Sequence, residues 1–411
     1  MGNLDYTQVL NKIENTRRFG NEPGVVVTAQ VIKVLREKGK QKRIIPYIHV
    51  AGTNGKGSVC AFFSSILKKE HMRVGTFVSP HLVDFEERIT VDGRMIPKED
   101  VTRLGNYLLD IDFGIGLTMF DYCLAMALLY FEEQQCDYMV IETGLGGRLD
   151  STNAIGTPQC AVITKIGYDH MAILGSDIAD IAAEKAGIIK ENGTVVVEQQ
   201  DKRAMQVIEQ EAQKKHARII TVEQSDIARC SGYALRLCGT FQWENAAAAE
   251  LAARYVLGKR YGGPEYAMQY DKTEPKREET DLNKRIKSAL EEAVWPGRME
   301  IVSKEPFLLV DGAHNSNGVD ALKESLMQMY PGEKFCFFMG VMADKDYDVM
   351  IREILPLAEE FYTVTPDSDR ALQASHLADF IRKEGVEATE LSGVDEIRKH
   401  LKRDTKNVAF G

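Results

Sequence analysis

The chain has 411 residues, of which 44% are hydrophobic and 27% charged, and its formal net charge is −10. This length exceeds one ordinary hydrophobic core, so we expect two domains with the composition of a globular protein. The negative charge argues against a surface built for polyanions, and we expect no nucleic acid among the partners.

Seven scattered cysteines, none in a C-x-x-C pair, are typical of small buried thiols and argue against a zinc site. They favour a reducing compartment. The N-terminus lacks a signal-peptide pattern, Tyr6 stands where a myristoylation motif needs Ser or Thr, and no apolar run could cross a bilayer. We expect a cytoplasmic monomer that does not bind membranes.

Hydrophobic periodicity predicts alternating strands and helices in the first part of the chain. The expected helices cover 5–16, 25–38, 119–134, 176–187 and 245–257, and the expected strands are 44–50, 74–78, 138–142, 161–166 and 194–197, with a small hairpin at 89–91. Such alternation implies a mainly parallel sheet.

Residues 258–281 are rich in Tyr, Gly, Pro and charge, and we interpret them as an exposed insertion before a helix at 282–293. A second alternation follows Pro296, with strands expected at 307–310, 335–339, 361–364, 386–391 and 408–410, and helices at 316–329, 347–359, 373–384 and 394–403. We therefore predict an α/β protein with domains at 1–295 and 296–411.

The segment HVAGTNGKGS, residues 49–58, joins a strand to an amphipathic helix. A glycine-rich turn at a helix N-terminus offers backbone N–H groups and the positive end of the helix dipole to phosphate. Lys56 adds a charge, and Ser58 adds a hydroxyl that can ligate Mg²⁺. The pattern departs from the standard P-loop, because Val50 stands where its first glycine would be. A turn without a ligand is the alternative, but its position between strand and helix favours a phosphate cradle.

Polar residues close several other strands, and ligands of open α/β sheets gather at such carboxyl ends. They are Ser79, Glu142, His170, Asp311 and His314. A lone histidine there is often structural, but an acidic residue after a buried strand resembles the Mg²⁺-organising carboxylate of nucleotide hydrolases. Together these residues indicate a Mg-nucleotide site. Lys185, at a helix end, reads from the residues alone as a surface lysine that favours the helix dipole.

Seven motifs occur in an order that resembles one known family. They are Gly52–Ser58, Ser79–Leu82, Glu142–Asp150, Asp169-His170, Glu184–Ile188, Pro296–Arg298 and Asp311–Asn315. From about residue 20 to its end, the chain resembles the folylpolyglutamate synthases, in bacteria often also dihydrofolate synthases, of the Mur ligase superfamily. The resemblance implies an N-terminal P-loop-type ATP-binding domain and a C-terminal Rossmann-like glutamate ligase domain.

The resemblance also implies an activity. Such an enzyme uses ATP to convert a substrate carboxylate into an acyl phosphate, which the amine of L-glutamate attacks to form an amide. The substrate is a folate and, in bifunctional members, also dihydropteroate. The reaction depends on neutralised phosphate charge and a positioned carboxylate.

Site residues carry over by position. The resemblance assigns ATP binding to Asn54, Gly55, Lys56, Gly57, Ser58, Asn245, Arg298 and Asp311. It assigns two Mg²⁺ ions to Ser58, Ser79, Glu142, His170 and Lys185, with Lys185 carbamylated by CO₂ and therefore anionic. It gives a catalytic role to Lys185 and to His314, which faces glutamate or the γ-phosphate, and it places Phe120 and Asp150 near the pterin.

Two departures stand out. Asp121 follows Phe120 where the family usually has Glu, which affects the expected folate pocket and not the ATP site. The chain stops at Gly411 where family members usually continue with Ser-Leu-Tyr, so we expect a C-terminal domain shortened at its end, with some loss of stability or glutamate binding.

Three alternative functions fit the sequence less well. Other Mur-type ligases act on nucleotide-linked peptidoglycan precursors and usually carry an extra N-terminal domain, for which about fifty residues before the loop are too few. A nucleotide-dependent switch would need an N-K-x-D motif, which is absent. A catalytically inactive relative is disfavoured because all the phosphate and metal positions are filled.

Overall fold

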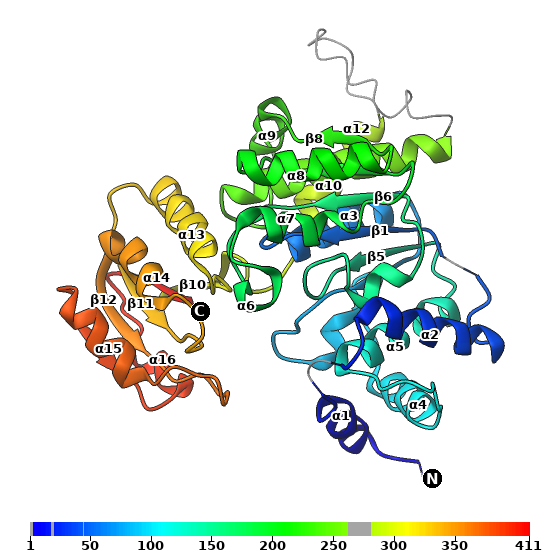
Figure 1. Ribbon diagram of the computed structural model, residues 1–411. Helices are drawn as coiled ribbons and strands as arrows, with labels where there is room; N and C mark the ends of the chain where they lie inside the picture. The colour runs from blue at the N-terminus through cyan, green and yellow to red at the C-terminus, as the bar shows by residue number, and fades with distance from the viewer. Residues whose placement is uncertain (1–2, 18–19, 44, 262–280) are drawn as a thin grey trace. The chain divides into compact units, whose positions relative to one another are not determined.

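The computed structural model describes residues 3–17, 20–43, 45–261 and 281–411, which form two compact units (Figure 1). Unit 1 comprises Met1–Ala234 and Glu244–Ala293, and unit 2 comprises Leu235–Trp243 and Val294–Gly411. Each unit contains one mainly parallel sheet flanked by helices, which confirms the predicted α/β class. No helix within the described ranges is long and apolar enough to span a membrane.

The sheet of unit 1 has eight strands in the order β4-β3-β2-β5-β1-β6-β7-β8. The strands are β1 (Tyr47–Ala51), β2 (Val74–Phe77), β3 (Ile89–Val91), β4 (Arg94–Met95), β5 (Tyr138–Glu142), β6 (Cys160–Ile163), β7 (Thr194–Val197) and β8 (Arg218–Thr221). All pairs are parallel except β2–β3 and β3–β4. β1 and β5 are buried at every residue, as expected for central strands covered on both faces.

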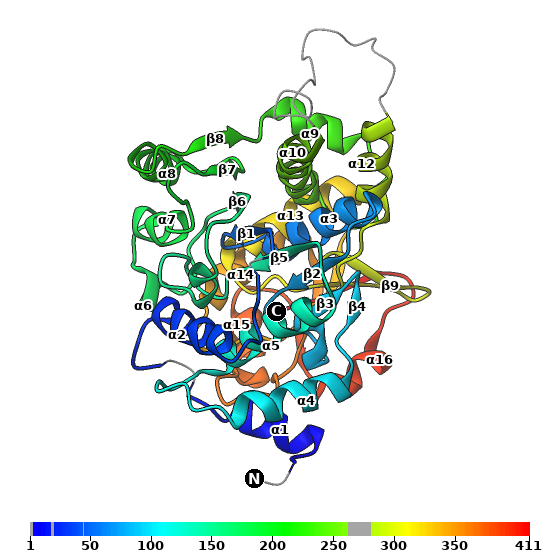
Figure 2. The same cartoon turned by 90° about the vertical axis from the view of Figure 1, so that its right-hand side faces the viewer.

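Helices cover both faces of this sheet (Figure 2). The helices of this part of the chain are α1 (Tyr6–Glu14), α2 (Gly24–Glu37), α3 (Lys56–Lys69), α4 (Lys98–Leu109), α5 (Met119–Glu133), α6 (Met171–Leu174), α7 (Ile178–Ala186), α8 (Lys202–Lys214), α9 (Gln224–Ser231), α10 (Phe241–Tyr261) and α12 (Asp281–Glu292), and α1 packs against α4 and α5. One face packs against α2 and α5 at Phe77, Met139 and Ile141, and against α7 and α8 at Ile163 and Val197. The face with α3, α10 and α12 lies opposite.

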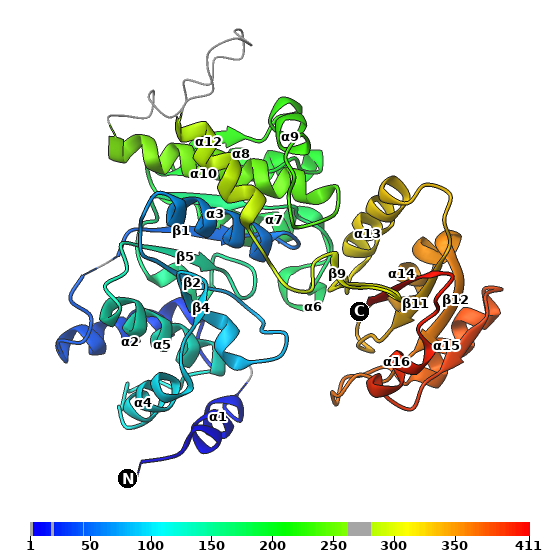
Figure 3. The same ribbon diagram turned by 180° about the vertical axis from the view of Figure 1, so that it is seen from behind.

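The sheet of unit 2, whose strands β9, β11 and β12 are labelled in Figure 3, has the order β13-β12-β11-β14-β10-β9. Its strands are β9 (Glu300–Lys304), β10 (Phe307–Asp311), β11 (Phe335–Met339), β12 (Ala358–Thr363), β13 (Ala388–Glu390) and β14 (Lys406–Phe410). Its helices are α13 (Ser316–Met329), α14 (Tyr347–Ile354), α15 (Ala374–Lys383) and α16 (Ile397–His400). Only β9 is antiparallel to its neighbour, and β14 lies between β11 and β10.

Most predicted elements are present, with three kinds of difference. The helix expected over 347–359 ends at Ile354, because Pro356 lacks the N–H that would continue it and Ala358 begins β12. The helix expected over 394–403 is reduced to a 3₁₀ turn and the four residues of α16. Local sequence patterns did not predict α4, α6, α8, α9, β8 and β9. Residues 262–280 of the predicted insertion at 258–281 lie outside the part of the chain that the structure describes. Residues 258–261 belong to α10.

Gly75 on β2 offers a test of how tightly unit 1 is packed. A Cβ at this position would lie 2.5 Å from Cδ1 of the buried Phe131 ring. We expect Gly75→Ala to lower the free energy of unfolding by about 1–3 kcal/mol through overpacking. Urea unfolding measures this, with Gly116→Ala as the control, because a Cβ at Gly116 meets nothing within 4 Å. Equal stabilities of the two variants would contradict the packing.

Candidate active site

The predicted phosphate cradle connects β1 to α3 through residues 52–55. Gly52 (φ 157°) and Gly55 (φ 90°) adopt backbone conformations that L side chains rarely take. A Cβ at Gly52 would overlap Thr164 Oγ1, and one at Gly55 would overlap the side-chain oxygen of Asn245. Both glycines are therefore needed for conformation and for space, and the loop exposes backbone at the N-terminus of α3, where anions bind.

The residues after β6 hold this loop in place. The backbone N–H groups of Thr53 and Asn54 donate to the carbonyl of Lys165 over 2.9 and 3.3 Å. Thr164 Oγ1 donates to the carbonyl of Asn54 over 2.6 Å. The roles of Thr164 and Lys165 were not predicted from the sequence. The signal that could have identified them is their position at the end of the predicted strand 161–166.

Two lysines donate to the same carbonyl at the start of the cradle. Lys56 Nζ lies 3.2 Å from the Gly52 oxygen and 3.2 Å from the Thr53 oxygen. Lys185 Nζ, from the last turn of α7, lies 2.7 Å from the same Gly52 oxygen. The carbonyl dipole thus brings two ammonium groups together at the phosphate loop, and Glu142 Oε1 lies 3.9 Å from Lys56 Nζ.

Lys185 is buried, with 4% of its surface exposed, so the expectation of a surface lysine was wrong. Burial, and to a lesser extent the nearby charge of Lys56, lowers the pKa of its amine to about 7. The negative charges of Asp169 and Asp150 act in the opposite direction and raise this pKa. Desolvation dominates because a cation loses most when removed from water. At neutral pH a substantial fraction of this amine is therefore uncharged and nucleophilic.

The residues expected to bind metal surround the same end of the sheet. Glu142 closes β5, is 4% exposed, and accepts a long 3.4 Å hydrogen bond from the Ser79 backbone. Ser58 is buried in the first turn of α3. His170 is more open, with 41% of its side chain exposed, and its Nε2 lies 3.9 Å from Asp169 Oδ1. A carboxylate and a hydroxyl beside a phosphate cradle fit Mg²⁺, which binds through one or two protein oxygens together with substrate phosphates.

No group of three or more His, Cys, Asp or Glu side chains that could hold a metal occurs in the described part of the chain. The metal site predicted from Ser79, Glu142 and His170 is therefore not a closed protein cage. Such a donor set would leave part of a Mg²⁺ shell to water or to ligand oxygens.

Asn245 and Phe120 also lie at this edge of unit 1. Asn245 is buried in the early part of α10, with its side-chain oxygen against Gly55. The Phe120 ring, at the start of α5, packs edge-on against Phe77 with centroids 5.4 Å apart. A Cβ on Gly144 would lie 2.8 Å from the Phe120 ring, so this ring covers the loop after β5, residues 143–150, called here the glycine-rich loop.

Asp150 and Asp121 organise this loop through hydrogen bonds. Asp150 accepts from the backbone of Gly144 (3.0 Å) and Leu145 (2.9 Å), and from Thr152. One carboxylate oxygen of Asp150 thus accepts from the loop and the other from Thr152 in the following 3₁₀ segment. A contact of Asp150 with the substrate stays a prediction. Asp121, the departure from the family pattern, caps α5 through Thr118 and accepts from Ser151 Oγ over 2.6 Å.

Unit 2 holds the remaining predicted residues in one cluster at the end of β10. Asp311 is buried, which raises its pKa, and it accepts from the Met299 backbone over 2.9 Å. Arg298 Nη1 donates to the Gly312 carbonyl over 3.1 Å. His314 Nδ1 donates to the same carbonyl over 2.8 Å, so this nitrogen carries the proton.

Comparison with known proteins gives consistent results. The Mur ligase middle domain matches residues 50–253, and the Mur ligase glutamate ligase domain matches residues 297–408. The dihydrofolate synthase/folylpolyglutamate synthase of Bacillus subtilis is 34% identical over 401 residues, covering 91% of this chain and 88% of the relative.

Two solved structures are similar over nearly the whole chain. E. coli FolC in complex with DHPP and ADP has a TM-score of 0.80 at 27% identity, covering 99% of this chain and 95% of that one. The bifunctional folylpolyglutamate synthase/dihydrofolate synthase from Yersinia pestis, complexed with AMPPNP and a Mn ion, has a TM-score of 0.80 at 25% identity, with the same coverage.

The depressed pKa of Lys185 predicts a pH dependence of stability. The folded amine titrates at about 7, whereas in the unfolded chain it titrates near 10.5. Between these values the unfolded state binds more protons, so this group's contribution to the free energy of unfolding rises with pH. We expect the stability of the wild type relative to Lys185→Met to be lowest below pH 7 and to increase from pH 7 to 10. Urea unfolding in bicarbonate-free buffer measures it, and a constant or falling difference would contradict the burial of a charged amine.

Proposed function

The chain belongs to the folylpolyglutamate synthase/dihydrofolate synthase family of Mur ligases, and we propose that it joins L-glutamate to a folate or dihydropteroate carboxyl group with hydrolysis of ATP to ADP. One observation in the site carries this proposal: Lys185 and Lys56 meet on the Gly52 carbonyl at the start of the phosphate loop. In a phosphate-binding turn Lys56 alone supplies the positive charge, and the second, buried lysine fits a ligase in which Lys185 is converted to a carbamate that supports a metal ion.

The cradle of unit 1 supports ATP binding. Asn54, Gly55, Lys56, Gly57 and Ser58 form the turn and the first residues of α3, where backbone N–H groups and the helix dipole favour phosphate. Lys56 supplies a positive charge, and Asn245 closes the turn from α10. Ser58 and Glu142 are the residues that would hold Mg²⁺, with Ser79 and His170 beside them. When bound, the metal spreads the charge of the transferred phosphoryl group.

Carbamylation of Lys185 is the finer part of this proposal. Carbamate formation needs a neutral amine, which attacks CO₂ and then loses a proton, so that a cation becomes an anion. Burial and the charge of Lys56 favour the neutral amine. The product would turn the repulsion between Lys56 and Lys185 into attraction, and would give the site an oxygen donor for a second Mg²⁺ that an ammonium group cannot provide.

The reaction then proceeds in two steps. An oxygen of the substrate carboxylate attacks the γ-phosphorus, the bond to ADP breaks, and an acyl phosphate forms. The amine of glutamate attacks the acyl carbon and loses a proton, and inorganic phosphate leaves from the tetrahedral intermediate. The cradle contributes by fixing the phosphates and offsetting their charge, which lowers the barrier mainly through positioning and electrostatics.

The substrate and unit 2 assignments rest on sequence position. Phe120 offers an aromatic face beside the glycine-rich loop, which suits a flat pterin ring. Asp150 orders that loop through its backbone N–H groups. In unit 2, we assign Arg298 and Asp311 to ATP, and His314 to glutamate or the γ-phosphate.

The activity is tested by following phosphate and ADP release with dihydropteroate or tetrahydrofolate, each with and without L-glutamate. We expect release that depends on ATP, on one pteroyl substrate and on glutamate together, with a glutamylated product of matching mass. The two pteroyl substrates separate a bifunctional enzyme from a folylpolyglutamate synthase alone. A ligase would be contradicted if neither pteroyl substrate stimulated the release of phosphate and ADP, or if the release were the same without glutamate.

Lys185→Ala tests the carbamate. We expect the rate of ligation to fall by about 10²–10³-fold, because a charged group that acts on the transition state is lost. Binding of a non-hydrolysable ATP analogue, measured by calorimetry, should stay near the wild-type value. Short carboxylic acids added to the variant should restore part of the rate by replacing the carbamate, and unaltered turnover of the variant would eliminate this role.

A further inference from the structure

The short 3₁₀ segment Ser151–Ala154 connects three separate parts of unit 1. Ser151 donates to Asp121 on α5, and Thr152 is hydrogen-bonded to His49 on β1 over 2.7 Å. Asn153 reaches the glycine-rich loop and the end of α7. These three residues are 6%, 0% and 8% exposed, so the segment is a buried junction and not a surface loop.

Asn153 joins two backbones with one side-chain amide. Its Nδ2 donates to the carbonyl of Arg148 over 2.9 Å and to the carbonyl of Gly187 over 3.1 Å. Arg148 belongs to the glycine-rich loop, and Gly187 is the residue that ends α7. The amide oxygen of Asn153 is buried and has no hydrogen-bond partner among the described residues. The polar contacts of this side chain are therefore the two hydrogen bonds that its Nδ2 donates.

The joint itself is a direct backbone contact. Arg148 N–H donates to the Glu184 carbonyl over 2.7 Å. A Cβ on Gly147 would lie 2.8 Å from the Glu184 oxygen and 3.0 Å from the Lys185 oxygen, and one on Gly187 would overlap the Cβ of Arg148. The glycine-rich loop therefore packs against the very turn that carries Lys185.

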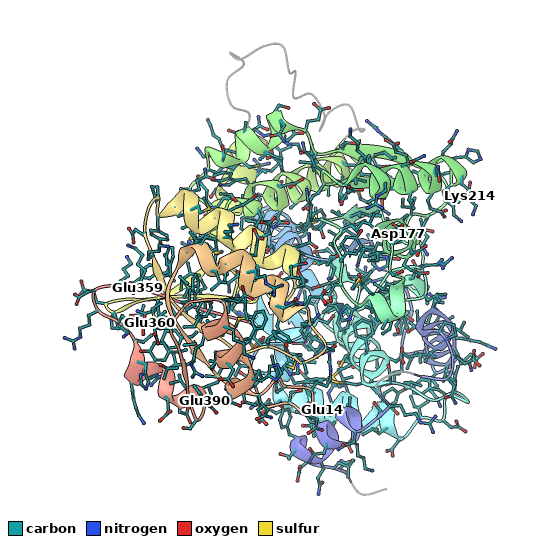
Figure 4. The ribbon with its side chains drawn as sticks, turned by 60° about the vertical axis from the view of Figure 1, so that its left-hand side comes forward. Glu14, Asp177, Lys214, Glu359, Glu360 and Glu390 are labelled. Carbon is teal, nitrogen blue, oxygen red and sulfur yellow. The ribbon has the colours of Figure 1, made fainter. Side chains whose placement is uncertain are left out.

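This joint fixes the position of the Lys185 backbone. The other end of α7 is fixed by Asp177, labelled in Figure 4, whose carboxylate accepts from the Ala179 backbone over 3.0 Å. The last turn of α7 is fixed by the loop and by Asn153, and from there Lys185 Nζ reaches the Gly52 carbonyl over 2.7 Å. A shift of that turn would move the amine relative to the phosphate loop.

We propose that Asn153 is a positioning residue of the ligation reaction, which holds the Lys185 turn against the glycine-rich loop and thereby sets the Lys185 amine at the phosphate cradle. The chemical role of Lys185 in this inference rests on the proposed function. The positioning itself rests only on the hydrogen bonds and close contacts of the joint.

Two variants disturb the joint in different ways. Asn153→Ala removes both donated bonds, and Gly187→Ala pushes the helix end and Arg148 apart by steric overlap. Asn407→Ala is the matched control. Asn407 is also a buried asparagine whose Nδ2 donates to backbone carbonyls, those of Phe307 (2.7 Å), Lys402 (2.9 Å) and Thr405 (3.4 Å), but it lies in unit 2.

The first measurement needs no turnover. The full-length apo protein, in bicarbonate-free buffer, is treated briefly with an amine-acylating reagent, and the modification of Lys185 is quantified by peptide mass spectrometry. We expect Lys185 to be modified several times faster in both joint variants than in the wild type and in Asn407→Ala. Thermal unfolding should show a loss of stability in Asn407→Ala at least as large as in Asn153→Ala, because Asn407 also accepts a hydrogen bond from the Lys402 backbone.

The second measurement is steady-state ligation. We expect kcat of the joint variants to fall by about a hundredfold, as for a catalytic group displaced by about 1 Å, with little change in KM for ATP. Unchanged Lys185 modification in both joint variants, or equal kinetic losses in Asn153→Ala and Asn407→Ala, would overturn the positioning role. A wild type without ligase activity would instead defeat the proposed function, while the modification rates would still test the joint.

Discussion

The carbonyl of Gly52 is the point on which the site depends. It accepts hydrogen bonds from two ammonium groups, one on the helix that begins at the cradle and one on α7. Two cations at one acceptor repel each other, and burial makes the repulsion stronger than in water. Phosphate oxygens beside Lys56, or loss of the proton from Lys185, would reduce this repulsion. The architecture of unit 1 is therefore suited to an anionic ligand.

The surrounding fold supplies this geometry from several directions. β1 delivers the loop, the segment after β6 accepts its N–H groups, and α10 closes it through Asn245. The side chain of Lys185 arrives from a helix whose end is packed on the glycine-rich loop. Glycines lie at each close approach, where a side chain would separate elements that must touch. The site is thus built by backbone contacts between parallel strand ends, and only a few side chains complete it.

Much of this could be predicted from the sequence. The strand before Gly52, the helix after it and the acidic end of β5 all have clear local patterns, and the order of the motifs identified the family. The burial of Lys185 could not be derived from its neighbours, because a lysine in the last turn of a helix has the same local pattern whether solvent or another loop covers it. Thr164, Lys165 and Asn153 were missed for a related reason: their roles come from hydrogen bonds to backbone far away in the chain.

We propose that the Lys185 amine carries CO₂ when the enzyme is competent. Carbon-13 NMR of the protein in ¹³C-bicarbonate, with Mg²⁺ and an ATP analogue, tests it most directly. We predict a carbamate signal in the wild type that disappears in Lys185→Ala and when bicarbonate is removed. A wild-type spectrum without such a signal, under conditions in which the protein ligates glutamate, would contradict the account.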